Sequence, residues 1–149
     1  MPLDTQPDAQ AVVACARKYV GVPWQHQGRL GQVGLDCAGL VIAVAHDLGL
    51  STFERRAYSR WPDSQELRTI LTAELCPIRL ADVSPGDILL LASGRFVDHL
   101  ALVGESPTSG CLTLIHAAAC YRKVVEHRFA PPWSGMVRGC YRFPGIAAP

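Results

Sequence analysis

The segment of residues 35–42 constrains this 149-residue chain more than any other part of it. It reads Leu-Asp-Cys-Ala-Gly-Leu-Val-Ile and follows a glycine-rich loop at residues 28–34. Aspartate is a preferred N-cap residue, so Asp36 predicts a helix that begins at Cys37. The apolar residues that follow predict that this helix is buried, and Gly49 is where we expect it to end.

A cysteine in the first turn of a helix lies beside unpaired N–H groups and the positive end of the helix dipole. Both effects favour thiolate over thiol and predict a lowered pKa for Cys37, which makes it a candidate nucleophile. The remaining five cysteines form no C-x-x-C pair and no zinc-finger spacing with histidine, so they are interpreted as free thiols: Cys15, Cys76, Cys111, Cys120 and Cys140.

Two histidines lie in apolar segments that predict strands. His99 begins the run His-Leu-Ala-Leu-Val, and His116 ends the run Leu-Thr-Leu-Ile-His. If these strands pair antiparallel, the start of one lies beside the end of the other, so the two imidazoles are neighbours at one edge of the sheet. A helix-borne thiol facing two strand-borne imidazoles supplies a nucleophile, a general base and a residue that orients the base.

The order of the predicted elements is helices first and strands second. This order predicts an α+β domain, with N-terminal helices packed on one side of an antiparallel sheet of about five strands. The helix-borne cysteine facing two strand-borne histidines resembles the arrangement in papain-like hydrolases, which implies a papain-like fold. No repeat or linker divides the chain, which predicts a single domain over residues 1–149 with its core at about 10–143. The expected helices are 8–20, 37–48 and 65–75, and the expected strands, connected as a meander, are 87–92, 99–104, 111–117, 122–128 and 137–143.

Several stretches, in one order along the chain, resemble the NlpC-type cell-wall cysteine peptidases. Residues 58–63 are similar to the phage-tail branch of that family. The stretches that carry the family resemblance are Gly21–Gly28 (Gly-Val-Pro-Trp-Gln-His-Gln-Gly), Asp36–Val41, Ser84–Leu89, His99 and Ile115–Ala117.

The resemblance implies that Cys37 is the nucleophile, His99 the general base and His116 the residue that orients the base. It further implies substrate contacts at Trp24, His26, Asp36 and Ala38. Trp24 and Ala38 depart from the tyrosine and serine that most members carry at those positions. His46 and His127 have no part in this arrangement and are predicted to be surface residues.

The activity that the resemblance implies is cleavage of amide bonds in bacterial peptidoglycan stem peptides. The implied setting is a phage tail tip, with tail hub or tail tip proteins as partners. Two alternatives stay open: a structural tail tip protein with the same fold and little or no peptidase activity, and an acyltransferase that uses the same thioester chemistry.

Composition excludes other classes of function. The net charge is only +1 and the chain has just two lysines, so we expect no nucleic-acid binding. No H-E-x-x-H pattern is present, and neither a metal nor another cofactor is expected. The apolar run at residues 37–50 is too short for membrane insertion. No signal-peptide pattern is present, so synthesis in the bacterial cytoplasm followed by incorporation into a phage tail is the expected route.

Overall fold

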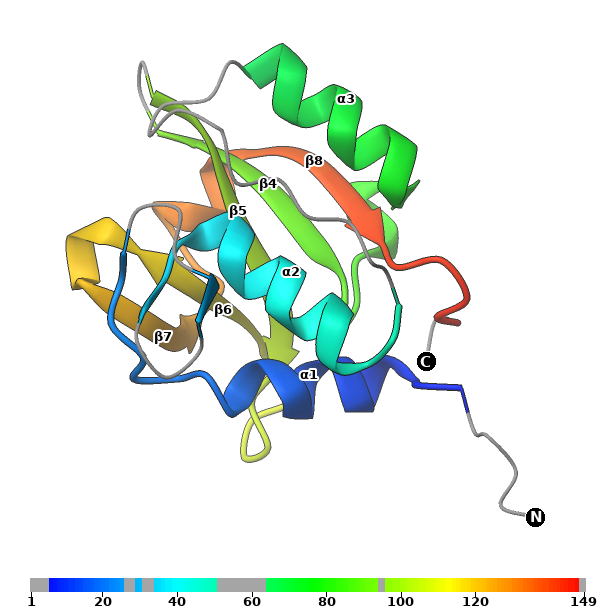
Figure 1. Ribbon diagram of the computed structural model, residues 1–149, viewed down its shortest axis with the longest axis horizontal. Coiled ribbons are helices and arrows are strands. Elements are labelled where there is room, and N and C mark those ends of the chain that lie inside the picture. Colours follow the sequence, from blue (N-terminus) through cyan, green and yellow to red (C-terminus); the bar gives the residue numbers. More distant parts are fainter. Residues whose placement is uncertain (1–5, 26–28, 31–33, 51–63, 94–95, 148–149) are drawn as a thin grey trace.

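Helices cover one face of a six-stranded antiparallel sheet (Figure 1). The computed structural model describes residues 6–25, 29–30, 34–50, 64–93 and 96–147. In this part of the chain the helices are α1 (Ala9–Arg17), α2 (Cys37–Asp47) and α3 (Ser64–Glu74). The predicted α+β class, with helices on one side of an antiparallel sheet, is confirmed, and each predicted helix overlaps an observed one.

The sheet follows the order β3-β8-β4-β5-β6-β7. Its strands are β3 (Cys76–Pro77), β4 (Ile88–Ser93), β5 (Phe96–Glu105), β6 (Leu112–Ala118), β7 (Lys123–Arg128) and β8 (Val137–Arg142). A separate hairpin joins β1 (Arg29–Leu30) to β2 (Gly34–Leu35). Short 3₁₀ helices lie at Leu80–Asp82, Ala119–Tyr121 and Trp133–Gly135.

The predicted meander holds from β4 to β7 and is wrong for β8. Instead of extending the sheet beyond β7, β8 returns to pair with β4, and the short β3 pairs with β8. This pairing makes β4 a central strand. Its residues Ile88, Leu89, Leu90 and Leu91 are all buried, since both faces of the strand are covered. A continuous apolar run of this kind is typical of a strand buried on both faces.

Two apolar clusters lie on the two faces of the sheet. The helix-side core joins α1, α2 and α3 to residues such as Leu90, Leu102 and Ile115. The loop-side core, on the other face, is built on Leu89, Leu91, Ala101, Val103, Leu114 and Cys140, with Trp133 and Met136 packed against it. Because side chains alternate along a strand, consecutive residues of β5 and β6 serve the two cores in turn.

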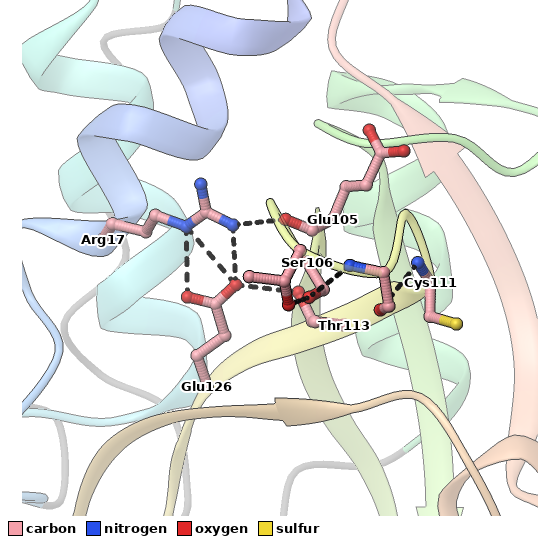
Figure 2. Close-up of polar contacts among 8 residues, drawn as sticks. Arg17, Glu105, Ser106, Cys111, Thr113 and Glu126 are labelled. Carbon is pink, nitrogen blue, oxygen red and sulfur yellow. Dashed lines mark hydrogen bonds and ion pairs between the residues drawn. The ribbon is translucent and has the colours of Figure 1, made fainter.

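A polar cluster fixes β7 against α1 and β6 (Figure 2). The Arg17 guanidinium holds the Glu126 carboxylate, with Nη2 at 2.9 Å from Oε1, and also donates to the Glu105 carbonyl at 2.6 Å. The Thr113 hydroxyl donates to the same carboxylate at 2.8 Å. Ion pairs as exposed as this one add little stability through charge alone. Their effect here is positional, because Glu126 directly precedes His127 in β7.

Gly104 leaves the space that this cluster needs. A Cβ at Gly104 would lie 2.6 Å from Thr113 Oγ1 and 3.1 Å from Glu126 Oε1. We therefore expect Gly104→Ala to lower the free energy of unfolding by about 1–3 kcal/mol, as overpacking does, measured by urea denaturation. Gly135→Ala is the matched control, since a Cβ there would meet nothing within 4 Å. Equal denaturation midpoints for the two variants would contradict the steric argument.

Candidate active site

Asp36 caps α2, as the sequence predicts. Its backbone is extended, and its Oδ1 accepts a hydrogen bond of 2.7 Å from the Gly39 N–H. The side chain is only 4% exposed, so this cap is a buried contact. Because the cap holds the first turn of α2 in a fixed place, it also fixes the backbone of Cys37.

The Cys37 thiol lies where α2 packs against β5. Burial, with a smaller contribution from the Asp36 carboxylate, raises the pKa of this thiol to about 11. Hydrogen bonds from the backbone amides of Leu100, Ala38 and Cys37 itself lower the pKa but do not prevail. The predicted lowering of the Cys37 pKa is therefore wrong. The sequence reveals the favourable helix start, whereas the desolvation comes from tertiary packing against β5.

This pKa changes the expected labelling of the cysteines. We expect iodoacetamide to modify the exposed Cys76 and Cys120 before Cys37 at pH 6.5. Only the thiolate reacts, and the raised pKa gives Cys37 a smaller thiolate fraction than an ordinary cysteine has. Labelling of Cys37 should accelerate about tenfold per pH unit up to its pKa. Peptide mass mapping of timed samples measures both rates. Faster labelling of Cys37 than of Cys76 at pH 6.5 would contradict the raised pKa.

Histidines from three neighbouring strands form a hydrogen-bonded row. His99 on β5 and His116 on β6 are joined by Nε2 and Nδ1 at 2.5 Å. His116 is joined in turn to His127 on β7, through the two Nε2 atoms at 2.7 Å. The row ends at the backbone, where His127 Nδ1 lies 2.9 Å from the Arg128 carbonyl oxygen. The prediction that His99 and His116 are neighbours in the sheet is confirmed.

The prediction that His127 is a surface residue is wrong. Its side chain is partly buried and contacts His116, because β6 and β7 pair Leu114 with His127 and so put His127 on the same face as His116. His46, by contrast, is exposed near the end of α2, as predicted. The signal that could have found His127 is the register of the β6–β7 hairpin, which a single sequence does not fix.

Trp133 covers the histidine row from the loop that precedes β8. Its indole ring lies edge-on to His116 with a centroid separation of 4.8 Å, and lies 5.4 Å from His127 and 6.2 Å from His99. Tyr121 adds a more distant edge contact of 6.2 Å to His116. No motif in the sequence pointed to either aromatic residue, because both come from loops that the topology brings to the sheet.

Burial keeps the imidazoles of His99 and His116 neutral at ordinary pH. It lowers the pKa of His99 to about 4. It also lowers the pKa of His116 to about 2, with further contributions from the neighbouring His99 and His127. His116 is fully buried. A neutral imidazole has one bare nitrogen, so each ring can accept a proton or a hydrogen bond.

The Cys37 thiol contacts β5, the strand that carries His99. Its backbone contact is the amide of Leu100, the residue after His99. Among the residues that the structure describes, no hydrogen bond joins the Cys37 thiol to the His99 ring directly. Hydrogen bonds between catalytic groups are often long without substrate and tighten in the complex, so this geometry is compatible with a base acting on the thiol.

Two further predicted site residues lie at or near α2. Ala38 and Trp24 are partly buried against the helix-side core. The Trp24 backbone N–H donates to the Arg122 carbonyl at 2.9 Å, which holds this segment close to the end of β6 and the start of β7. His26 lies outside the described residues. Contact of these side chains with a substrate stays a prediction.

The described residues give no metal centre: within them, no three His, Cys, Asp or Glu side chains converge to hold an ion. The row of histidines is extended, and its inner nitrogens face one another instead of a common point. Nor does any helix in the described ranges have the length and apolar character that a membrane span requires.

Comparison with known proteins identifies the fold. Neither a protein-family model nor the sequence of a curated protein matches this chain. Solved structures of NlpC/P60 proteins do match it. A Staphylococcus aureus protein described as similar to lipoprotein of the NLP/P60 family superposes with a TM-score of 0.65 and 21% identity, over 99% of this chain and 45% of that protein. The chain therefore spans less than half of that protein's length.

Two further structures resemble the chain over most of its length. The NlpC/p60 domain of the peptidoglycan hydrolase SagA has a TM-score of 0.60 and 21% identity, over 91% of this chain and 98% of the domain. The peptidoglycan hydrolase RipB from Mycobacterium tuberculosis has a TM-score of 0.60 and 19% identity, over 91% of this chain and 64% of that structure. At such identities the likeness establishes the NlpC/P60 papain-like fold.

Proposed function

We propose that this protein is a cysteine hydrolase that cleaves amide bonds in peptidoglycan stem peptides. The observation that carries the proposal is the meeting of two features at β5. The first is a capped helix start that holds Cys37 against the Leu100 amide. The second is the hydrogen bond between His99 and His116 one residue away. A nucleophile, a base and a group that orients the base are the minimum for covalent acyl transfer.

In the first half of the reaction, His99 takes the proton of the Cys37 thiol through its Nδ1, since its Nε2 is bonded to His116. The sulfur then attacks the scissile carbonyl carbon and gives a tetrahedral oxyanion. The backbone N–H of Cys37 at the positive end of α2 is the donor that would stabilise this charge. As the tetrahedral intermediate collapses, the carbon–nitrogen bond breaks, the amine leaves with the proton from His99, and a thioester on Cys37 remains.

In the second half, His99 accepts a proton from water as the oxygen attacks the thioester. Collapse of this intermediate releases a carboxylic acid and returns the proton to the Cys37 sulfur. The raised thiol pKa and the lowered His99 pKa imply that the resting pair is neutral. Proton transfer then accompanies the attack instead of preceding it.

Peptidoglycan as the substrate rests on two kinds of support. The sequence resemblance points to cell-wall peptidases, and two of the structures with the same fold are described as peptidoglycan hydrolases. The departures at Trp24 and Ala38 lie at the positions where the resemblance implies substrate contact. We therefore expect the bond preference to differ from that of members with tyrosine and serine there.

The place of action that we propose is a phage tail tip. Support for it comes from the sequence resemblance to the phage-tail branch alone. In this setting the protein is made in the bacterial cytoplasm, binds tail hub or tail tip proteins, and reaches the wall when the particle docks. Co-expression with those proteins followed by size-exclusion chromatography tests the proposal, and absence of the chain from purified particles would refute it.

A second candidate is a structural tail tip protein with this fold and little or no peptidase activity. The observation in its favour is the substrate-free geometry: the thiol is neutral at ordinary pH and, among the described residues, makes no hydrogen bond to His99. The two candidates differ in whether Cys37 ever forms a covalent acyl intermediate.

The deciding experiment is digestion of purified peptidoglycan sacculi. The peptidase predicts new amino termini, detected by dinitrophenyl labelling and mass spectrometry of the released peptides, and none with Cys37→Ala. Sacculi from species with different stem peptides would locate the cleaved bond. A folded wild-type protein that releases no more amino termini than Cys37→Ala on any of them would favour the structural candidate.

A further inference from the structure

We propose that His127 is a positioning residue that sets the tautomer of His99 through His116. The inference rests on the proposed function, because it assigns His99 the task of general base. It adds a fourth member to the predicted group of Cys37, His99 and His116. The geometry that carries it is the unbroken row of hydrogen bonds from β5 to the backbone of β7.

The direction of every hydrogen bond in the row follows from its last one. The Arg128 carbonyl oxygen can only accept, so His127 Nδ1 must carry the proton in the 2.9 Å contact between them. In the proposed arrangement this is the ring's single proton, so His127 Nε2 is bare and can only accept. His116 Nε2 must therefore be the donor across the 2.7 Å contact.

The same reasoning reaches the base. With its proton on Nε2, neutral His116 has a bare Nδ1, so His99 Nε2 donates across the 2.5 Å contact. The Nδ1 of His99 is thereby left without a proton. That nitrogen is the one free to take the proton of Cys37. One backbone carbonyl thus determines which nitrogen of a ring two strands away acts as the base.

The row also favours the charged form of His99 during the reaction. When His99 accepts the thiol proton, its Nε2–H becomes a stronger donor to His116. Hydrogen bonds in a chain polarise one another. Donation from His116 Nε2 to His127 therefore makes His116 Nδ1 a stronger acceptor for the proton on His99 Nε2. A buried imidazolium is otherwise disfavoured, as the lowered pKa of His99 indicates.

The fold holds His127 in the required place. The residue before it, Glu126, is fixed by Arg17 and Thr113 (Figure 2). The β6–β7 register pairs His127 with Leu114. The Trp133 ring packs against the rings of both His116 and His127, with centroid separations of 4.8 and 5.4 Å.

The test compares two substitutions of similar size. His127→Gln offers a carbonyl oxygen near the place of Nε2 and can still accept from His116, whereas His127→Phe fills the space without an acceptor. We expect His127→Phe to lower kcat at least tenfold with little change in KM, and His127→Gln to recover most of that loss. His46→Phe, at the exposed histidine of α2, is the control for general effects of the substitution.

A second readout reports on the proton itself. In ¹⁵N–¹H spectra of histidine-labelled protein, we expect His99 to be protonated at Nε2 in the wild type and in His127→Gln, and to lose that single tautomer in His127→Phe. An unchanged His99 tautomer in folded His127→Phe would overturn the proposal. This readout needs no catalysis, so a wild type without hydrolase activity would refute the proposed function while the spectra still decide the role of His127.

Discussion

Replacing Cys37 with alanine is expected to abolish the release of amino termini from peptidoglycan, a loss of at least about 10³-fold. The reason is that Cys37 supplies the only bond-forming atom of the proposed mechanism, and no other described cysteine lies at a helix start beside the histidine row. His99→Ala should reduce hydrolysis by a similar factor, since a neutral thiol with a pKa of about 11 needs a base. Initial rates of amino-terminus release measure both losses.

The two residues are expected to act as one unit. The double variant should be hardly slower than either single variant, because groups that act in one step are not additive. His116→Ala should be milder, since its proposed task is orientation. The control is the far-ultraviolet circular dichroism of each variant, which should match that of the wild type. Full activity of folded Cys37→Ala would refute covalent catalysis by this thiol.

Local signals in the sequence were sufficient for the elements that carry the site. Asp36 predicted the start of α2 because an N-cap acts on the residues directly after it. The apolar runs that contain His99 and His116 predicted β5 and β6, and antiparallel pairing then brought the two rings together. Each of these steps depends on neighbours in the chain or on one hairpin.

Features that depend on contacts between distant parts of the chain could not be predicted in the same way. β8 pairs with β4, but several strands have a similar apolar character, so the sequence does not indicate which of them β8 joins. His127 joined the site only through the register of β6 and β7, which no turn motif between those strands reveals. The predicted shift of the Cys37 pKa had the wrong direction, because burial of the thiol against β5 outweighs the local effect of the helix start.

The buried histidines should also make the fold sensitive to acid. Lowering the pH from 7 to 4.5 is expected to decrease the free energy of unfolding by about 2–3 kcal/mol for each of His99 and His116. Both have folded-state pKa values below the ordinary 6.5, about 4 and about 2. Between 6.5 and those values the unfolded chain binds protons that the folded chain does not. Stability therefore falls as the pH drops below 6.5, until about pH 4 for His99 and further for His116.

Urea denaturation at the two pH values measures the loss, and His116→Asn separates the histidine contribution from that of carboxylates. Asparagine can still accept from His99 Nε2 but does not titrate. Glu126, whose pKa is lowered chiefly by its bond to Arg17 against the opposing effect of burial, remains in both proteins. The variant should lose about 2–3 kcal/mol less than the wild type between pH 7 and 4.5. An equal loss in both would mean that His116 is solvated enough to titrate normally, and the row of neutral rings on which the assignment of the base depends would not exist in solution.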